Sequence, residues 1–298
     1  MTAAGDLLFV YGTLRPGQAG HERLLRGRLT APAVLEDHEL RLGTWPWVRP
    51  AAGSSVAGEV VAVEPALLVE LDRLEDVAGG LYRRERCTVL TAEGGEAAAW
   101  AYTAGSVAAG GDRSVPGGDW LAAFAWYVSY GSNLSSGRFR RYLDHCRDKS
   151  EPWRWAAVEV PHRLLFARDS TTWGGGGVAF LDPAATPGAR TLGRAWLVTW
   201  DQFADVLAQE CGLPVGSVEV PALDAGCVIT RPGHWYGCVV PLGRHEGWPM
   251  VTFTDEAGAD LLPTGPGAAY RAVVSEGLAE AHGLSAVEAA AYIARHSP

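Results

Sequence analysis

The apolar positions of this chain fall into short runs typical of strands and longer stretches with helical spacing. Residues 7–14 form an apolar run, rich in aromatic and branched side chains, that leads into Gly12. Residues 125–133 repeat the pattern, with Gly131 in the corresponding place. Because glycine permits a sharp backbone turn, both segments predict a strand that ends in a turn of sequence Tyr-Gly-Thr or Tyr-Gly-Ser.

A second pattern also occurs twice, and it combines a strand with a helix. Residues 58–63 read as a strand, and leucines at helical spacing follow over 67–75. Residues 193–198 read as the matching strand, and 202–210 again have an apolar helical face. In both halves the initial glycine and the final glutamate are 17 positions apart. Two ordered matches in the same structural context predict a duplicated domain.

The boundary between the two copies lies in breaker-rich sequence. Residues 108–111 and 115–120 are rich in glycine, and the second copy's strand begins by about Phe124. We therefore expect one domain over residues 1–120 and a second over 124–298.

The second copy is longer than the first. A glycine run at 174–177 and a breaker-rich stretch at 182–188 predict loops. The last segment, 268–296, has helical periodicity that Gly283 interrupts, and residues 285–288 have capping-box spacing. The sequence therefore predicts a tail of two helices.

Short strands outnumber helices in the rest of the chain. Residues 34–35, 40–42, 87–90 and 97–102 have strand-like composition, and glycine pairs separate several of them. This pattern favours the α+β class, as a small mixed β-barrel with a few helices that occurs twice.

Composition limits the partners and the compartment. The 298 residues carry a formal net charge of −9, which disfavours binding to phosphate backbones, and no basic run suggests a membrane surface. No apolar stretch approaches the ~18 residues of a membrane-spanning helix, and residues 1–6 do not resemble a signal peptide. Five cysteines without CxxC spacing predict no disulfide framework, which favours a cytoplasmic protein.

Sequence motifs for common cofactors and nucleophiles are absent. The eight histidines are scattered without HExxH spacing, so we expect no metal. No GxxxxGK[ST] and no GxSxG motif occurs, and the glycine run at 174–177 lacks the strand–turn–helix context of a dinucleotide site. The sequence therefore predicts no cofactor.

Five segments of the first half, taken in order, resemble the γ-glutamylamine cyclotransferase or AIG2-like family. They are FVYGTLRPG at 9–17, GEV at 58–60, LDRLE at 71–75, LYRR at 81–84 and SVPGGDW at 114–120. The resemblance covers nearly all of residues 6–120, and the ordered set is more specific than any one motif.

The second half is similar to those γ-glutamylcyclotransferases that open with YGSN. The matching segments are YGSNL at 130–134, WGGG at 173–176, LAQE at 207–210, Tyr270, and GL at 277–278. The chain departs from that pattern after Glu210, where the usual Tyr and basic residue do not follow at a short distance. This departure leaves the substrate and the activity of the second half open.

The resemblance implies a reaction without a cofactor on a small-molecule γ-glutamyl substrate. The α-amine attacks its own γ-carbonyl, 5-oxoproline forms, and the amine partner leaves. A carboxylate with a raised pKa can move both protons, and backbone N–H groups of a glycine turn can bind the developing oxyanion. The implied catalytic residues are Glu75 and Glu210, and the implied substrate-binding residues are Tyr11, Gly12, Thr13, Leu14, Tyr82, Tyr130, Gly131, Ser132 and Asn133.

Other interpretations of these residues remain open. Glutamates at helix ends are usually solvated, and Tyr11 and Tyr130 also fit as core aromatics. Trp235 and Tyr236 either close the second pocket or pack in the core. One half, more plausibly the second, is alternatively a binding or scaffold module, and a related γ-glutamyl acyl transfer would use the same pocket. The sequence names neither the leaving amine nor the oligomeric state.

Overall fold

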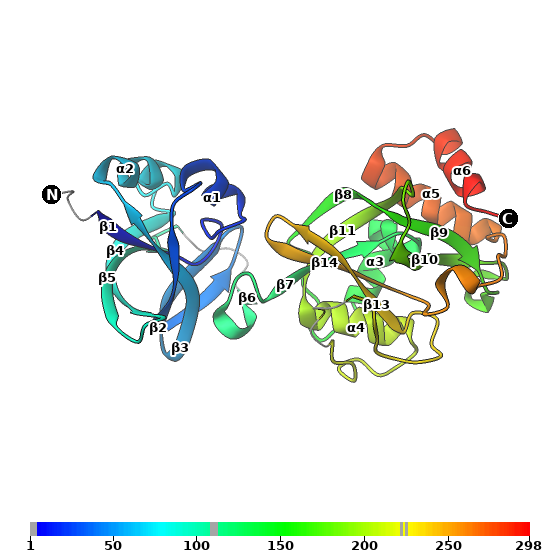
Figure 1. Ribbon diagram of the computed structural model, residues 1–298, viewed down its shortest axis with the longest axis horizontal. Helices are drawn as coiled ribbons and strands as arrows, with labels where there is room; N and C mark the ends of the chain where they lie inside the picture. Colours follow the sequence, from blue (N-terminus) through cyan, green and yellow to red (C-terminus); the bar gives the residue numbers. More distant parts are fainter. Residues whose placement is uncertain (1–4, 108–112, 221–222, 224–225) are drawn as a thin grey trace. The chain divides into compact units, whose positions relative to one another are not determined.

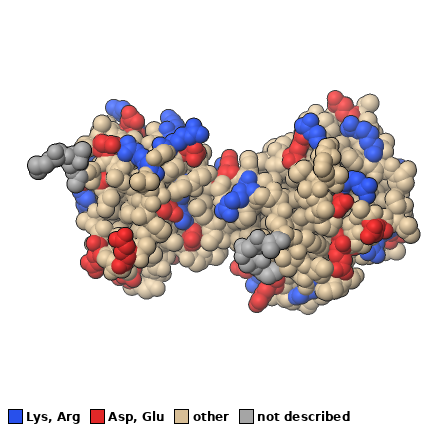
Figure 2. Space-filling view, viewed as in Figure 1, with Lys and Arg blue, Asp and Glu red and all other residues tan. Residues whose placement is uncertain are grey.

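A computed structural model describes residues 5–107, 113–220, 223 and 226–298. The chain forms two compact units, residues 1–123 and 124–298. The breaker-rich segment expected at 108–111 lies outside the described residues. Acidic and basic side chains are interspersed on the face shown in Figure 2.

The first unit is a closed barrel of five strands with two helices beside it (Figure 1). Its strands are β1 (Asp6–Val10), β2 (Thr30–Leu42), β3 (Pro46–Val63), β4 (Tyr82–Thr91), β5 (Glu96–Ala104) and the short β6 (Arg113–Ser114). Its helices are α1 (Ala19–Leu24), α2 (Pro65–Leu74) and a 3-10 turn, η1 (Pro116–Gly118). The sheet order is β3-β1-β5-β4-β2-β6, and pairing of β2 with β3 closes the barrel.

The second unit is a curled six-stranded sheet with a separate two-stranded sheet and more helices. Its strands are β7 (Phe124–Ser129), β8 (Arg154–Val160), β9 (His162–Ala167), β10 (Val178–Ala185), β11 (Thr191–Thr199), β12 (Val228–Ile229), β13 (Cys238–His245) and β14 (Trp248–Thr254). Its α-helices are α3 (Ser136–Leu143), α4 (Trp200–Glu210), α5 (Ala268–His282) and α6 (Ala286–Arg295). Its 3-10 turns are η2 (Ser132–Leu134), η3 (Thr171–Trp173) and η4 (Gly258–Asp260).

The two units share a strand order. In the first unit neighbouring strands run β2-β3-β1-β5-β4, and in the second they run β8-β11-β7-β14-β13. The parallel pair is β1 with β5 in one unit and β7 with β14 in the other. A helix follows β3 and β11 directly, as α2 and α4. The predicted α+β class is therefore confirmed.

The second sheet differs from the predicted barrel because its described strands do not close it. β8 has only 7 residues and pairs with β11, whereas β2 has 13 and pairs with both β3 and β4. Among the described residues β8 lies at one edge of this sheet and β12 at the other, and β8 does not pair with β13.

Each of the two glycines that begin the repeated pattern lies where the neighbouring strand leaves no room for a side chain. A Cβ atom on Gly58 would lie 2.3 Å from the carbonyl oxygen of Val10. A Cβ atom on Gly193 would lie 2.8 Å from a methyl carbon of Val128 and 3.2 Å from the carbonyl oxygen of Ser129. These contacts explain the repeated glycine by close strand packing.

Local sequence explains the two helices that end in glutamate. α2 has Pro65 in its first turn and buries Leu68 and Leu71. It ends at Leu74 with Glu75 as its C-cap, before Asp76 adopts a left-handed φ of 48°. Thr199 begins α4 with a capping box.

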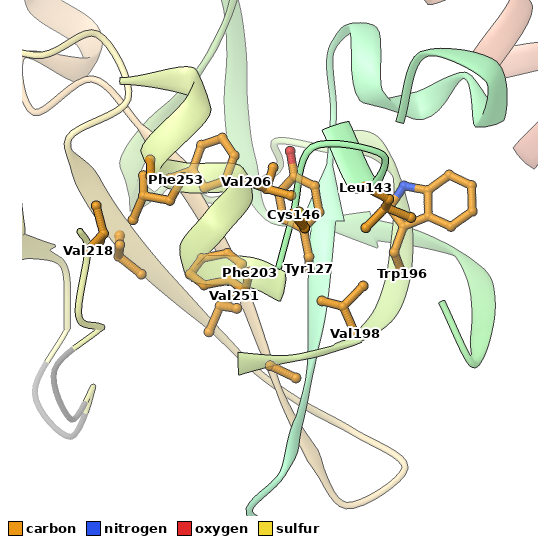
Figure 3. Packing of buried hydrophobic residues seen from close by; sticks show 14 of the residues in the cluster. Tyr127, Leu143, Cys146, Trp196, Val198, Phe203, Val206, Val218, Val251 and Phe253 are labelled. Atoms are coloured by element: carbon orange, nitrogen blue, oxygen red, sulfur yellow. The ribbon is translucent and has the colours of Figure 1, made fainter. Parts of the chain in front are cut away.

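α4 packs against the second sheet through an aromatic core. Phe203 and Val206 of α4 lie near Tyr127 of β7, and Trp196 of β11 belongs to the same cluster (Figure 3). The rings of Tyr127 and Phe203 have centroids 5.8 Å apart. The packing fixes the last turn of α4 over the end of β7, and that turn carries Glu210.

Two local expectations need correction, and a third is confirmed. The short strands at 34–35 and 40–42 are parts of one strand, β2, which a register shift at Asp37 bends. Residues 182–185, expected as a loop, belong to β10, since a shift before Ala185 accommodates a proline that cannot donate to the ladder. The helical tail at 268–296 is confirmed, including the capping box at 285–288.

The expectation that the cysteines form no disulfide needs correction, because a disulfide joins Cys227 and Cys238. The pairing of β12 with β13 sets Ile229 opposite Cys238 and so brings Cys227 near it. The two cysteines are 11 positions apart, a spacing that carries no recognisable motif. Within the described residues, no helix is long and apolar enough to cross a membrane.

Candidate functional site

A pocket at one end of the first barrel collects all of the site residues predicted for that half. Its lining is Phe9, Val10, Tyr11, Gly12, Thr13, Leu14, Pro46, Glu75, Tyr82 and Tyr102. The end of β1, the turn after it, the end of α2 and the start of β4 contribute the six predicted residues. Pro46 and Tyr102 are additions that sequence reasoning missed.

Glu75 is the carboxylate of this pocket. It lies at the C-cap of α2, and burial raises the pKa of its side chain to about 7. No group among the described residues donates a hydrogen bond to its carboxylate, so nothing offsets the loss of hydration. A carboxylate with this pKa exists in both protonation states near neutral pH and can accept and return a proton.

The residues of the turn after β1 line the same pocket. Arg15 N–H donates to the carbonyl of Gly12 at 3.0 Å, which closes the turn. Among the described residues no acceptor pairs with the N–H groups of Gly12, Thr13 and Leu14. A Cβ atom on Gly12 would lie 2.7 Å from Pro46, so the glycine lets the turn approach the pocket wall. Such a run of free donors suits an anion or oxyanion.

The side chain of Arg15 holds this turn in place. Its guanidinium donates to both carboxylate oxygens of Glu59, at 2.9 Å and 2.7 Å, and also pairs with Asp119. The side chains of Arg15 and Glu59 are only 8% and 15% exposed, so the fork is largely shielded from water. This geometry ties the turn to β3 and to the end of the unit.

The pocket tyrosines use their hydroxyls to fix backbone. Tyr11 donates to the carbonyl of Tyr102, and Tyr82 donates to the carbonyl of Pro46 at 2.6 Å. Tyr102 donates to Asp72 at 2.8 Å, and Asp72 also pairs with Arg84 at 3.4 Å. The rings of Tyr11 and Tyr82 therefore line the pocket as walls, with hydroxyls already engaged.

The second unit has a pocket in the corresponding place. Its lining is Tyr127, Tyr130, Gly131, Ser132, Asn133, Ala179, Glu210, Tyr236, Phe253 and Tyr270. All five site residues predicted for the second half are among them. Tyr236 lines this pocket, and Trp235 instead packs near Phe180, with ring centroids 6.2 Å apart.

Glu210 differs from Glu75 in having polar neighbours. The amide of Asn133 donates to its carboxylate at 3.0 Å. Burial raises the pKa of Glu210, and hydrogen bonds from Tyr142 and Asn133 and the charge of Arg138 oppose that rise. The Oδ1 atom of Asn133 is buried without a partner among the described residues.

Hydroxyls and strand backbone build the rest of the second pocket. Tyr130 donates to the carbonyl of Phe253 at 2.7 Å, as Tyr11 does to a carbonyl of β5. Tyr270 of α5 accepts from the N–H of Ala179 at 3.1 Å, and Tyr236 donates to the carbonyl of Ala179 at 3.2 Å. The pocket wall is therefore more aromatic than the first one.

Both pockets are small, and neither contains a recognisable metal site. They are similar in size, with empty volumes of about 290 Å³ and about 270 Å³ that include open solvent. In the described parts of the chain no group of three or more His, Cys, Asp or Glu side chains could hold a metal ion.

Comparisons with known proteins identify relatives of this chain. The family model described as "Gamma-glutamyl cyclotransferase, AIG2-like" matches residues 8–122. Gamma-glutamylcyclotransferase family protein YtfP of Escherichia coli is 33% identical over 115 residues, which are 38% of this chain and 95% of YtfP. Histone deacetylase 5 of Arabidopsis thaliana is 36% identical over 198 residues, 56% of this chain, but the match spans only 30% of that relative's length.

A solved structure extends along both units. YkqA from Bacillus subtilis is 19% identical, with 98% of this chain and 97% of YkqA covered and a TM-score of 0.34. An AIG2-like protein from Mus musculus is 28% identical over 35% of this chain and 78% of its own, with a TM-score of 0.29. The match to nearly the whole of YtfP, together with the family model over the unit that carries Glu75, shows that this chain belongs to the γ-glutamylcyclotransferase family.

Proposed function

We propose that the first unit is a γ-glutamylcyclotransferase that releases 5-oxoproline and a free amine from a γ-glutamyl amine or a γ-glutamyl-protected small molecule. One observation carries the proposal: the unpaired Glu75 carboxylate, with a pKa of about 7, shares a pocket with the free backbone N–H groups of Gly12, Thr13 and Leu14. An acid/base group and an oxyanion site are what an intramolecular acyl transfer requires.

The reaction needs only proton transfers and charge stabilisation. Ionised Glu75 takes a proton from the substrate α-ammonium, and the resulting amine attacks the γ-carbonyl. A C–N bond forms in the ring while the N–H groups of residues 12–14 bind the carbonyl oxygen as it gains charge. Glu75 then protonates the leaving nitrogen and the old C–N bond breaks. Glu75 next carries the second proton from the ring nitrogen to the released amine. The α-nitrogen loses two protons and the leaving nitrogen gains two, so the carboxylate returns to its starting state.

The small pocket contributes by holding the chain of the γ-glutamyl group bent. The nucleophile and the carbonyl belong to one molecule, so restricting its conformations removes much of the entropic barrier. Tyr11 and Tyr82 favour this role because their hydroxyls are bound to backbone and their rings are fixed. No cofactor enters any step.

We also propose that the second unit is a related cyclotransferase-like domain. Its support is the shared strand order, the equal spacing from Gly58 to Glu75 and from Gly193 to Glu210, and a pocket that again joins a glutamate to a glycine turn. Glu210 and Asn133 would act there as acid/base and substrate ligand.

The contact between Asn133 and Glu210 favours the alternative that the second unit is not catalytic. The hydrogen bond from Asn133 occupies one oxygen of Glu210 and favours its ionised form, which makes it a weaker base than a free buried carboxylate. A binding module would keep the turn and the aromatic wall without turnover.

The test is 5-oxoproline release from a panel of γ-glutamyl amines and dipeptides. Wild type is compared with Glu75→Gln, Glu210→Gln and the double variant, and Glu70→Gln on the exposed face of α2 is the control. Loss only in Glu75→Gln makes the first unit the enzyme and the second a module. Losses on different substrates establish two working sites. Folded protein that releases no 5-oxoproline from any substrate refutes the proposal, and transfer of the γ-glutamyl group to an added amine would favour the acyl-transfer alternative.

We further propose that the protein acts in the cytoplasm, without a nucleic-acid or membrane partner. The formal net charge of −9 and the free thiols of Cys87, Cys146 and Cys211 support this. The redox state of the Cys227–Cys238 pair in the cell tests the proposed compartment. Alkylation of thiols at the moment of cell lysis, followed by mass analysis, should find this pair reduced if the compartment is reducing.

A further inference from the structure

Two charged side chains that are not among the described residues lining the second pocket hold its glycine turn at 131–134. Arg194 of β11 donates through Nη1 to the carbonyl of Leu134 at 3.1 Å. Glu280 of α5 accepts from the backbone N–H of Ser136 at 2.9 Å. Arg194 and Glu280 also pair with each other at 2.6 Å. The ion pair therefore binds backbone groups on both sides of Ser135.

The guanidinium of Arg194 has a fixed place inside the second unit. Its side chain is only 6% exposed, and its Cζ atom lies 4.3 Å and 3.9 Å from the ring centroids of Trp155 and Trp196. Trp196 itself donates through Nε1 to the carbonyl of Asn133 at 3.0 Å. Because alternate residues of a strand face the same side, Arg194 and Trp196 together hold the carbonyls of two successive turn residues.

Arg194 occupies the same strand position as Glu59 of the first unit, with the opposite charge. Each residue follows the repeated glycine of its strand. Arg194 lies opposite Ser129, and Glu59 lies opposite Val10, the two residues that directly precede the Tyr-Gly of their turns. In the first unit Glu59 binds Arg15, which belongs to the turn itself. In both units this position of the strand therefore holds the glycine turn, and in the second unit the ion pair reaches a helix of the tail.

Helix α5 lies against both ends of this turn. A Cβ atom on Gly131 would lie 2.6 Å from the hydroxyl oxygen of Tyr270. A Cβ atom on Gly277 would lie 2.3 Å from the Cβ atom of Leu134. Glu280 is three residues further along the same helix, where it meets Arg194. The glycines therefore allow a close approach that places the carboxylate of α5 beside the turn.

The position of the turn determines the geometry of the second pocket. Gly131, Ser132 and Asn133 line this pocket together with Glu210. The side-chain amide of Asn133 donates to the carboxylate of Glu210 at 3.0 Å and to the hydroxyl of Tyr127 at 3.1 Å. A donor–acceptor distance of about 3.6 Å is no longer a hydrogen bond, so a shift of the turn by less than about 1 Å separates Asn133 from Glu210.

We propose that Arg194 and Glu280 are positioning residues of the second site, which hold the glycine turn in its place against Glu210. The inference rests on the proposed function of the second unit, and it makes the tail helix α5 a part of that site. Both residues act through the backbone of the turn rather than on the substrate. Their loss should therefore affect turnover more than substrate binding.

The first test measures 5-oxoproline release by the full chain with Glu75→Gln, so that only the second site can turn over. The substrates are γ-glutamyl-glycine and γ-glutamyl-methylamide. Arg194→Met keeps the length of the side chain but removes its charge and its donors. It should lower kcat about 10-fold to 100-fold with both substrates, because a displaced turn misaligns the reacting groups. KM should change less than about 3-fold.

Three further variants decide whether the loss comes from the position of the turn. Arg194→Lys keeps the charge and can donate to both acceptors, so it should recover part of kcat. Adding Glu280→Ala to Arg194→Met should cost little more than Arg194→Met alone, because the two residues act through one ion pair. Tyr292→Phe is the matched control, since the hydroxyl of Tyr292 accepts from the N–H of Leu192 and so joins the helical tail to β11 through a contact that does not involve the turn. This control should leave kcat unchanged.

Two kinetic results would overturn the proposal when all variants are measured at a temperature where they are folded. One is an equal fall of kcat in Arg194→Met and Tyr292→Phe, which would report loosening of the tail as a whole. The other is a rise of KM at unchanged kcat, which would report an effect on substrate binding alone.

A measurement without turnover separates this inference from the proposed activity. The side-chain amide of Asn133 gives two proton signals in the NMR spectrum of ¹⁵N-labelled protein, and Glu210→Ala shows where they lie without the Glu210 acceptor. Arg194→Met should move the signals toward these positions, and Tyr292→Phe should leave them at the wild-type positions. Such a movement supports the inference even if the second site releases no 5-oxoproline. Signals that stay at the wild-type positions in folded Arg194→Met protein overturn it.

Discussion

Replacing Glu75 by glutamine should stabilise the first unit, by an amount that depends on pH. Burial raises the pKa of Glu75 from 4.5 to about 7 in the folded protein. Above pH 7 the folded protein therefore buries a charged carboxylate that is better hydrated in the unfolded chain. The difference between the two pKa values corresponds to about 3 kcal/mol, an upper limit because the side chain is partly exposed.

The fold accommodates protonated Glu75 better than ionised Glu75, and this preference sets the direction in which the free energy of unfolding changes with pH. Below pH 4.5 both folded and unfolded chains carry a neutral Glu75, so the wild type incurs no cost. Between pH 4.5 and about 7 the unfolded chain ionises first, and the free energy of unfolding of the wild type falls. Glutamine stays neutral throughout, so its advantage should be small at pH 4.5 and complete by pH 8.

Hydrogen exchange of the slowest amides of β1 and β5 measures this free energy for the first unit alone. The rates, corrected for the intrinsic pH dependence of exchange, are compared at pH 5 and pH 8. Glu70→Gln, at an exposed position of the same helix, should have little effect at either pH. If Glu75→Gln gains equal stability at pH 5 and pH 8, or gains none at pH 8, burial of the Glu75 charge does not destabilise the fold.

Three further results are expected. The kcat/KM of the first site should rise with pH and level off above an apparent pKa near 7, because ionised Glu75 is the base; a flat pH–rate profile from pH 5.5 to 8 would contradict this. Gly58→Ala should destabilise the first unit by about 3 kcal/mol or more, since its Cβ would lie 2.3 Å from the carbonyl oxygen of Val10; an unchanged urea midpoint would argue against that contact. Cys227→Ser should lower the stability of the second unit by up to about 3 kcal/mol, the entropic value for a closed loop of 11 residues, and reductant should have no further effect on the variant.

The local pattern of the sequence predicted those parts of the site that lie on consecutive elements. β1 ends at the turn that contains Gly12, and the neighbouring strand β3 leads into α2, whose C-cap is Glu75. Because β1 and β3 lie side by side, the turn and the glutamate meet at one edge of the barrel. Tyr102 and Pro46 reach the same pocket through the parallel pairing of β1 with β5 and the hairpin of β2 with β3. Those contacts join residues that are far apart in the chain, so the local spacing of residues does not predict them.

The position of Arg138 shows most clearly what the sequence could not supply. Residues 138, 140 and 141 are three arginines on one short helix, and composition alone gives each the same chance of being solvated. Tertiary contacts distinguish Arg138 from the other two. Its guanidinium packs against Trp173 of η3, whose ring in turn packs against Tyr270 of α5, and both elements are far along the chain. These contacts leave its Nε buried while Arg140 keeps its acidic neighbours. A buried donor without a partner becomes visible only once the fold has placed every other group.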